Sequence, residues 1–330
     1  MNRRAFLFLT AGASWVRPYG AVAQSTDRPR RIGLIVTTSE TDPDAQARAA
    51  AFRDGLRELG WVEGRNLTIE YRWGAGDAAR VESMVDELVA RPPDVIVSNG
   101  TLALAALQRR TRTIPVVFVV VTNPVGAGFV ASLARPGGNV TGFSTYEPEM
   151  GGKWFETLRE FAPGIRRVAV ISDPVLDNIS AVASTVALFA ERAGVSVVPM
   201  RFQNPSDDIE ARLAAFADVP DGGMIAMPTA LNLLARERLV AAAARHRLPA
   251  IYPFRPYAQS GGLMSYGFEP IDLFRRSAAY VDRIFKGERP AEMPVQIPTR
   301  FQLVLNLRTA RELGIEVPQM LLARADEVIE

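Results

Sequence analysis

The sequence lacks cysteine and contains a single histidine, His246, among its 330 residues. Without cysteine the chain can form no disulfide, no iron–sulfur cluster, no thiolate nucleophile and no cysteine-ligated zinc site. One imidazole also excludes a metal centre built on several histidines. His246 lies between two arginines at an expected helix end, which is typical of a surface residue.

The common enzyme signatures are also missing. No G-x-G-x-x-G follows the first apolar run, and no phosphate-binding G-x-x-x-x-G-K-[ST] occurs. The nearest approach to a G-x-S-x-G elbow, at 142–146, ends in tyrosine. Asp42 and Asp44 flank a proline at an expected helix start, where the helix dipole favours acidic groups. We therefore predict no catalytic residue, no metal ligand and no cofactor.

Long hydrophobic runs are absent from the middle of the chain. The strongest apolar run there, Ile114–Val121, has eight residues, whereas a membrane-spanning helix needs about 20. Hydrophobic residues nevertheless make up 48% of the chain and charged residues 22%. This composition is that of a globular protein and excludes a disordered one.

The first residues carry an export pattern. Arg3 and Arg4 precede an uncharged run over 5–16, and Ala21-Val22-Ala23 follows. This order predicts a secretory signal peptide over 1–23, cleaved after Ala23, and a periplasmic location. The paired arginines resemble a twin-arginine signal, while a Sec signal and a buried N-terminal helix remain alternatives.

Removal of this leader changes the formal net charge of the chain from +2 to −1, because the leader contains three arginines and no acid. The basic balance of the whole sequence therefore gives no support to nucleic-acid binding.

The remaining chain repeats a strand–helix pattern. Continuous apolar runs typical of buried parallel strands pair up along the sequence: 31–36 with 167–172, 94–97 with 223–227, and 113–118 with 247–252. Helical periods separate them, as over 45–59 and 179–193. We predict an α/β protein of two Rossmann-like lobes with parallel sheets. Ligands of such sheets bind beyond the carboxyl ends of the strands, which places a ligand cleft between the lobes.

Five stretches carry a family resemblance: RELGWVEGRNLTIEY at 57–71, NPVGAGFVASLARPGGNVTGFS at 123–144, RHRLPAIY at 245–252, GGLMSYG at 261–267 and LLARADEVIE at 321–330. With these, the chain resembles the substrate-binding proteins of a family of ABC importers that includes tryptophan-binding members. The resemblance implies a type I periplasmic-binding fold with three crossings between lobes. The first lobe is expected over 30–146 plus about 267–298, and the second over 147–266 plus about 299–330. Crossings are expected at Tyr146–Pro148, Tyr266–Pro270 and within Pro294–Phe301.

In the first lobe the resemblance implies ligand contacts in the loops after the strands. The Ser98-Asn99-Gly100-Thr101 loop would present backbone amides and a hydroxyl to a ligand carboxylate, with helix capping by Thr101 as the rival interpretation. Ser39 lies in the loop after the first strand. Asn123 stands where the family often has aspartate, and asparagine lacks the carboxylate that would pair with a cationic group of the ligand. The amino-acid specificity of the family therefore does not carry over directly to this chain. We expect Ser39, Asn99, Gly100, Thr101 and Asn123 to contact the ligand.

In the second lobe the expected contacts are more aromatic. Asp173 could provide an anion for a ligand ammonium group, and Asn178 either binds the ligand or caps a helix. Aromatic rings would flank a flat solute, although core or interlobe packing is the alternative for Tyr252 and Phe254. The expected ligand contacts are Asp173, Asn178, Thr229, Tyr252, Phe254, Tyr257 and Tyr266.

Together these features predict a monomeric periplasmic solute-binding component of an ABC importer. Its solute would be a small organic acid or amino acid, possibly aromatic, and its partner an inner-membrane permease, with no nucleic acid involved. Two alternatives stay open, a ligand-sensing protein that signals through a membrane receptor and, more remotely, a cleft enzyme.

Overall fold

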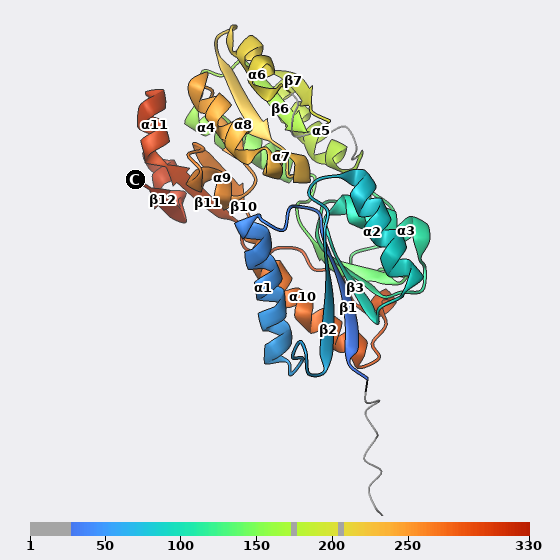
Figure 1. Ribbon diagram of the computed structural model, residues 1–330. Helices are drawn as coiled ribbons and strands as arrows, with labels where there is room; N and C mark the ends of the chain where they lie inside the picture. The colour runs from blue at the N-terminus through green and yellow to red at the C-terminus, as the bar shows by residue number, and fades with distance from the viewer. Residues whose placement is uncertain (1–27, 173–176, 204–207) are drawn as a thin grey trace, which may run out of the picture.

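The computed structural model describes residues 28–172, 177–203 and 208–330. The predicted signal peptide and Asp173 lie outside these residues, and the side chain of Asn178 is likewise not described. Figure 1 shows two α/β lobes stacked along the long axis of the molecule, each built on its own sheet. The predicted fold class is confirmed.

The first lobe contains a five-stranded parallel sheet in the order β2-β1-β3-β4-β5. Helices α2 and α3 pack together, and α1 packs against α10, which returns from late in the chain. The elements of this lobe are β1 (Arg30–Val36), α1 (Pro43–Glu58), β2 (Leu67–Trp73), α2 (Ala78–Ala90), β3 (Val95–Asn99), α3 (Thr101–Arg110), β4 (Val116–Val121), β5 (Val140–Ser144), α10 (Pro270–Phe285) and the short 3₁₀ helix η1 (Pro290–Glu292).

The second lobe contains a seven-stranded sheet in the order β12-β11-β10-β9-β8-β6-β7. Its pairs are parallel except for β10 with β11. Parallel sheets were predicted, without strands β11 and β12, so this antiparallel pair is a correction. The elements are α4 (Met150–Phe161), β6 (Arg167–Ser172), α5 (Asp177–Arg192), β7 (Ser196–Arg201), α6 (Ile209–Ala217), β8 (Gly222–Ala226), α7 (Ala230–Leu234), α8 (Arg236–Arg245), β9 (Ala250–Tyr252), α9 (Arg255–Gln259), β10 (Met264–Gly267), β11 (Gln302–Asn306), α11 (Leu307–Leu313), α12 (Gln319–Arg324) and β12 (Glu327–Ile329).

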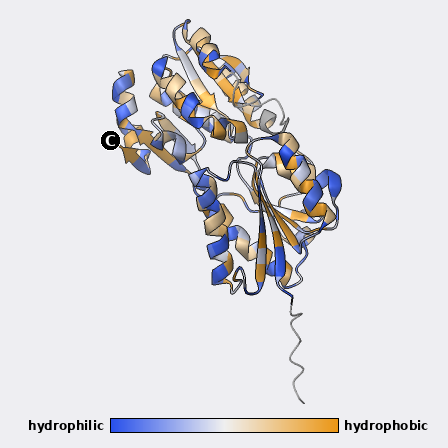
Figure 2. Cartoon of the chain, viewed as in Figure 1, coloured by the Kyte–Doolittle hydropathy of each residue, from blue (hydrophilic) through white to orange (hydrophobic). Residues whose placement is uncertain are grey.

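Local sequence signals explain where several helices begin. Asp42 accepts a hydrogen bond from the Asp44 amide at 2.9 Å, and Pro43 occupies the first turn of α1. Asp208 caps α6 in the same way through the amide of Ala211. Figure 2 shows hydrophobic residues along the strands and hydrophilic residues on outward-facing helix surfaces. Burial of the apolar faces against the two sheets holds each lobe together.

Three segments connect the lobes. The chain passes from β5 to α4, from β10 to α10, and from the segment at Gln296, which bridges Phe143 of β5, to β11. An aromatic cluster packs at these crossings. Its centre is Tyr146, whose ring centroid lies 4.9 Å from that of Trp154, 5.0 Å from Phe268 and 6.2 Å from each of Phe254 and Phe301.

Candidate functional site at the facing strand ends

The carboxyl end of β3 leads into a helix start that no side chain caps. Gly100 is the N-cap residue of α3, with φ +82°, and no side-chain hydrogen bond caps this helix start. A Cβ at Gly100 would lie 3.3 Å from the Thr37 hydroxyl oxygen, so the loop packs closely against the end of β1. Thr101 is the first helical residue rather than the cap. The first amides of α3 are therefore suited to an external acceptor such as a carboxylate.

The neighbouring polar residues of the first lobe differ in what they contact. The Asn99 side-chain amide donates to the Val119 carbonyl at 3.4 Å. Asn123, with φ +46°, accepts the Gly126 N–H at 3.0 Å and forms a local turn. Ser39 contacts the Thr41 hydroxyl at 2.9 Å. Of these predicted positions, Asn99 is adjacent to Gly100 at the start of α3. The side-chain oxygen of Asn123 already accepts a hydrogen bond within its own loop.

The backbone is strained at the end of β4. Val120 has φ +61°, at a register shift between Val119 and Val121. A β-branched residue rarely adopts this conformation, and such strain clusters at functional sites. Two residues later the Thr122 hydroxyl lies 2.8 Å from that of Thr145. The irregularity thus lies at the strand ends that lead toward the other lobe.

In the second lobe, two predicted aromatic residues form a pair. Tyr252 and Tyr257 stack with their ring centroids 4.9 Å apart and their planes 15° from parallel. Burial raises the pKa of both hydroxyls, while the charge of Arg236 acts to lower that of Tyr257. Neither hydroxyl has a hydrogen-bond partner among the described residues.

The other predicted residues of this lobe lie elsewhere. Phe254 belongs to the aromatic cluster at the crossings. This is the interlobe packing that the sequence left open as the alternative to a ligand contact. Ser265 pairs with Tyr252 in parallel register, so the next residue, Tyr266, points to the opposite face of the sheet, where it lies beside Phe301. Thr229 is the N-cap of α7 and accepts the Asn232 amide at 3.1 Å. Tyr252 and Tyr266 therefore cannot flank the same face of a solute.

The lobes touch through a charged pair. Arg236, at the start of α8, donates to the Asp44 carboxylate of α1 at 2.6 Å. Beside it, Gly76 of the first lobe lies so close to Leu234 of α7 that a Cβ would collide with that side chain. One turn along α1 from Asp44, the buried Arg48 donates to the Thr38 hydroxyl at 3.4 Å. The carboxyl-terminal ends of β1, β2 and β8 therefore face each other.

Buried polar atoms without a hydrogen-bond partner gather at this boundary. Within the described residues there are seven such side-chain atoms, and each would cost folding free energy unless something else satisfies it. Arg72 Nε, beside the carboxyl end of the edge strand β2, lies 3.5 Å from the Glu87 carboxylate. Of the other six atoms, two belong to the last two residues of a strand, three to segments that follow strands, and one to the first crossing: Ser98 Oγ and Tyr252 Oη, then Arg48 Nε, Arg236 Nε and Tyr257 Oη, then Glu147 Oε1.

Arg48, Arg236 and Glu147 were missed by the sequence analysis. Arg236 carried a usable signal, because a cation at the first position of a helix opposes the helix dipole. Arg48 follows Asp44 by four residues, a spacing that in the sequence indicates an ordinary ion pair on a helix surface. In the structure the Arg48 side chain is buried. Burial raises the pKa of Glu147, and the nearby Glu149 adds to this effect.

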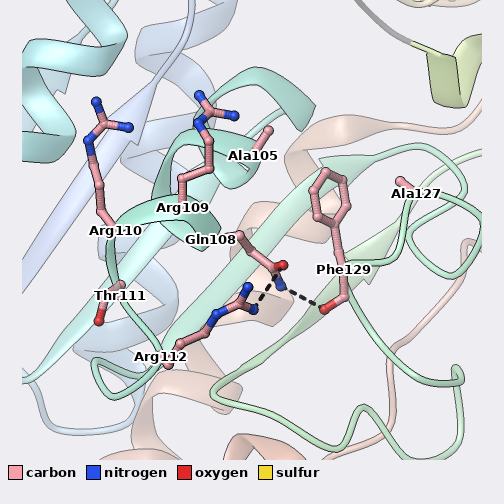
Figure 3. Close-up of a pocket in the computed structure, with 8 residues that line it drawn as sticks. All are labelled: Ala105, Gln108, Arg109, Arg110, Thr111, Arg112, Ala127 and Phe129. Carbon is pink, nitrogen blue, oxygen red and sulfur yellow. Dashed lines mark hydrogen bonds between the residues drawn. The ribbon is translucent and has the colours of Figure 1, made fainter.

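Two surface pockets lie at the other end of the sheets. A pocket of about 640 Å³ surrounds the carboxyl end of α3, where Gln108 donates to the Phe129 carbonyl and accepts from Arg112 (Figure 3). Arg109 and Arg110 pair with acidic residues of α2. A second pocket, of about 510 Å³, adjoins the amino-terminal ends of β6, β8 and β9. Neither coincides with the strand ends where ligands of this architecture bind.

The part of the chain that the structure describes contains no group of three or more potential metal-ligating side chains and no helix long and apolar enough to cross a membrane. His246 lies 2.8 Å from Glu210 at the end of α8, in a surface pair.

The fold and its facing strand ends define a two-lobed solute-binding protein. Residues 32–329 match the model of the ABC transporter substrate binding protein family, and the chain belongs to that family. The predicted family is thereby confirmed. The family consists of substrate-binding proteins of ABC transporters, which agrees with the expectation that this chain is not an enzyme.

Similar proteins extend over most of the chain. A conserved domain protein from Vibrio cholerae is 29% identical, with a TM-score of 0.85, over 91% of this chain and 100% of that one. An ABC domain from Streptococcus pneumoniae in complex with L-Trp is 25% identical, with a TM-score of 0.84 and the same coverage. A tyrosine-binding protein of Clostridioides difficile is 22% identical over 294 residues, covering 89% of this chain and 84% of the relative.

Proposed function

We propose that this protein is the periplasmic solute-binding component of an ABC importer and that it binds an amino acid or small organic acid with a flat or aromatic part. The observation that carries the proposal is the group of buried, unpartnered polar atoms where the strand ends of the two lobes face each other. In a native protein such atoms call for a partner, and a bound solute can provide it. The L-Trp complex and the tyrosine-binding relative support an aromatic amino acid.

The proposed binding mode uses both lobes. The amides at the start of α3, beside Gly100 and Thr101, receive the carboxylate of the solute. The hydroxyls of Tyr252 and Tyr257 and the guanidinium groups near Asp44 contact the remainder. Because these groups come from both lobes, the lobes must separate to admit the solute and close to bury it. A permease could then distinguish the loaded from the empty form.

The signal-like leader, which lies outside the described residues, supports export to the periplasm, and we propose that the mature chain begins after Ala23 and acts as a monomer. Its membrane partner would be the permease of an ABC transporter, as the family implies.

A ligand screen tests the solute class. The purified mature protein is heated with each of the twenty common amino acids and with aromatic acids, and hits are measured by calorimetry. A solute at 100 times its dissociation constant stabilises the folded state by about 2.7 kcal/mol if only that state binds it. Failure of every amino acid and organic acid, with binding of a sugar instead, would contradict the proposal.

A matched pair of glycine variants tests the carboxylate position. Gly100 and Gly128 both have positive φ, so alanine strains the backbone at either site, but only at Gly100 would the Cβ lie beside Thr37 and the α3 amides. We expect Gly100→Ala to weaken binding by about tenfold or more and Gly128→Ala to retain the wild-type affinity. Equal affinities of the two variants would remove the α3 amides from the site.

A further inference from the structure

Two guanidinium groups lie near Asp44, where the lobes touch: Arg236 pairs with it, and Arg48 lies one turn further along α1. Arg236 of α8 donates to Asp44 at 2.6 Å through one terminal nitrogen. Arg48 of α1 is only 6% exposed and donates to Thr38 through one terminal nitrogen at 3.4 Å. Burial lowers the pKa of Arg48, and Asp42 and Asp44 oppose that effect. Both cations are therefore partly removed from water at the boundary between the lobes.

Each of these arginines has a buried Nε–H that lacks an acceptor among the described residues. A guanidinium group only donates hydrogen bonds. An apolar group placed against these atoms would leave both donors unpaired, which is costly for a charged group. The atoms thus select for a hydrogen-bond acceptor.

Two hydroxyl groups extend this set within the second lobe. Tyr252 and Tyr257 are stacked, almost fully buried, and unpartnered at their hydroxyl oxygens within the described structure. Tyr257 lies in α9, which packs against α8, the helix that begins at Arg236, and the charge of Arg236 acts to lower the pKa of the Tyr257 hydroxyl. A solute acceptor that reaches Arg236 would also be offered a phenolic O–H.

Resting on the proposed function, we propose that Arg48, Arg236, Tyr252 and Tyr257 form a second subsite, which takes a hydroxyl or carboxylate of the solute in addition to the carboxylate held at α3. The solute therefore carries acceptor groups at two places. Aromatic amino acids with a hydroxyl or carboxylate on the ring fit this requirement, and those with a plain hydrocarbon ring leave the subsite unsatisfied.

Four probes that share the amino-acid end test this subsite: L-phenylalanine, 3-hydroxy-L-phenylalanine, L-tyrosine and 4-carboxy-L-phenylalanine. Their affinities for the mature wild-type protein are measured by calorimetry. At least one ring-substituted probe should bind about tenfold tighter than L-phenylalanine, as expected for a hydrogen bond with a charged group. In Arg236→Gln this preference should fall to about threefold or less.

The exposed Arg238, on the same helix, gives a matched control, since Arg238→Gln should keep the full preference. Tyr257→Phe provides a second variant that removes only a hydroxyl, so a folding defect in an arginine variant does not decide the outcome. Equal wild-type affinities for all four probes, or a preference that survives in both Arg236→Gln and Tyr257→Phe, would overturn the subsite. Binding of none of the four, while other solutes bind, would instead overturn the aromatic amino-acid class itself.

Discussion

Replacing Asp44 by asparagine is expected to weaken solute binding about fivefold, through loss of the ion pair with Arg236 that joins the lobes. The two groups are 2.6 Å apart, and their side chains are 33% and 18% exposed. Exposed pairs contribute about 0.2–1 kcal/mol and hydrogen bonds to charged groups about 1.5–3 kcal/mol. A half-buried pair should therefore contribute about 1 kcal/mol.

This energy acts on lobe closure because the pair spans the two lobes. If opening separates α1 from α8, only the closed form gains from the pair, and its loss shifts the equilibrium toward the open form. A solute that binds the closed form then shows a larger apparent dissociation constant. The pair is close to the surface, so raising the ionic strength should reduce the difference between variant and wild type.

A double-mutant cycle separates the pair from other effects of its members. Calorimetry on wild type, Asp44→Asn, Arg236→Gln and the double variant, with the tightest amino acid of the screen, gives the coupling energy. We expect about 1 kcal/mol, with Arg236→Gln costing more than Asp44→Asn because Arg236 also belongs to the proposed second subsite. A coupling energy near zero would refute a role of the ion pair in closure.

Three further predictions concern stability and export. Tyr257→Phe should leave the free energy of unfolding unchanged or raise it by up to about 1 kcal/mol, since it removes a buried hydroxyl without a partner; a clear loss in urea titration would show that the hydroxyl is satisfied. Gly267→Ala places a Cβ against a backbone carbonyl at the second crossing and should destabilise by about 1–3 kcal/mol, whereas Gly164→Ala, which meets no atom, should be neutral in the same titration. Replacing Arg3 and Arg4 by lysine should leave precursor in the cytoplasm if the twin-arginine route is used, and normal periplasmic amounts by immunoblot would favour the Sec route.

The local elements of the fold could be predicted because their signals lie close together in the sequence. The apolar runs at 31–36 and 167–172 predicted the strands observed as β1 and β6. Asp42 marked a helix start that the structure shows with a side-chain cap. A cap or a strand is decided by a few neighbouring residues, so a single sequence contains the information.

The edge of the second sheet could not be predicted in this way. Strands β11 and β12 are short, and β11 joins β10 in antiparallel register after the chain has crossed to the first lobe and back. Continuous apolar runs indicate buried strands but not their partners or direction. Pairing between segments far apart in the chain is decided by tertiary packing.

The candidate site also combines features that local sequence predicted with features that depend on tertiary packing. Gly100 and Thr101 could be placed at a helix start from their sequence, and the structure adds that no side chain caps that start. Phe254, Tyr257 and Tyr266 looked alike as aromatic residues near strand ends, but tertiary structure puts them in the crossing cluster, in a stacked pair and on the opposite face of the sheet.

The sequence by itself determined the two α/β lobes and the solute-binding family, because strands, helix starts and family motifs are local patterns. Only the tertiary structure decided that Arg236 of the second lobe pairs with Asp44 of the first, one turn from the buried Arg48, and that the Nε–H groups of both arginines are buried without an acceptor in the described structure. Burial and the pairing of charges depend on which distant surfaces come together. Those residues, which look like ordinary surface charges in the sequence, therefore became candidates for solute recognition only once the lobes were in place.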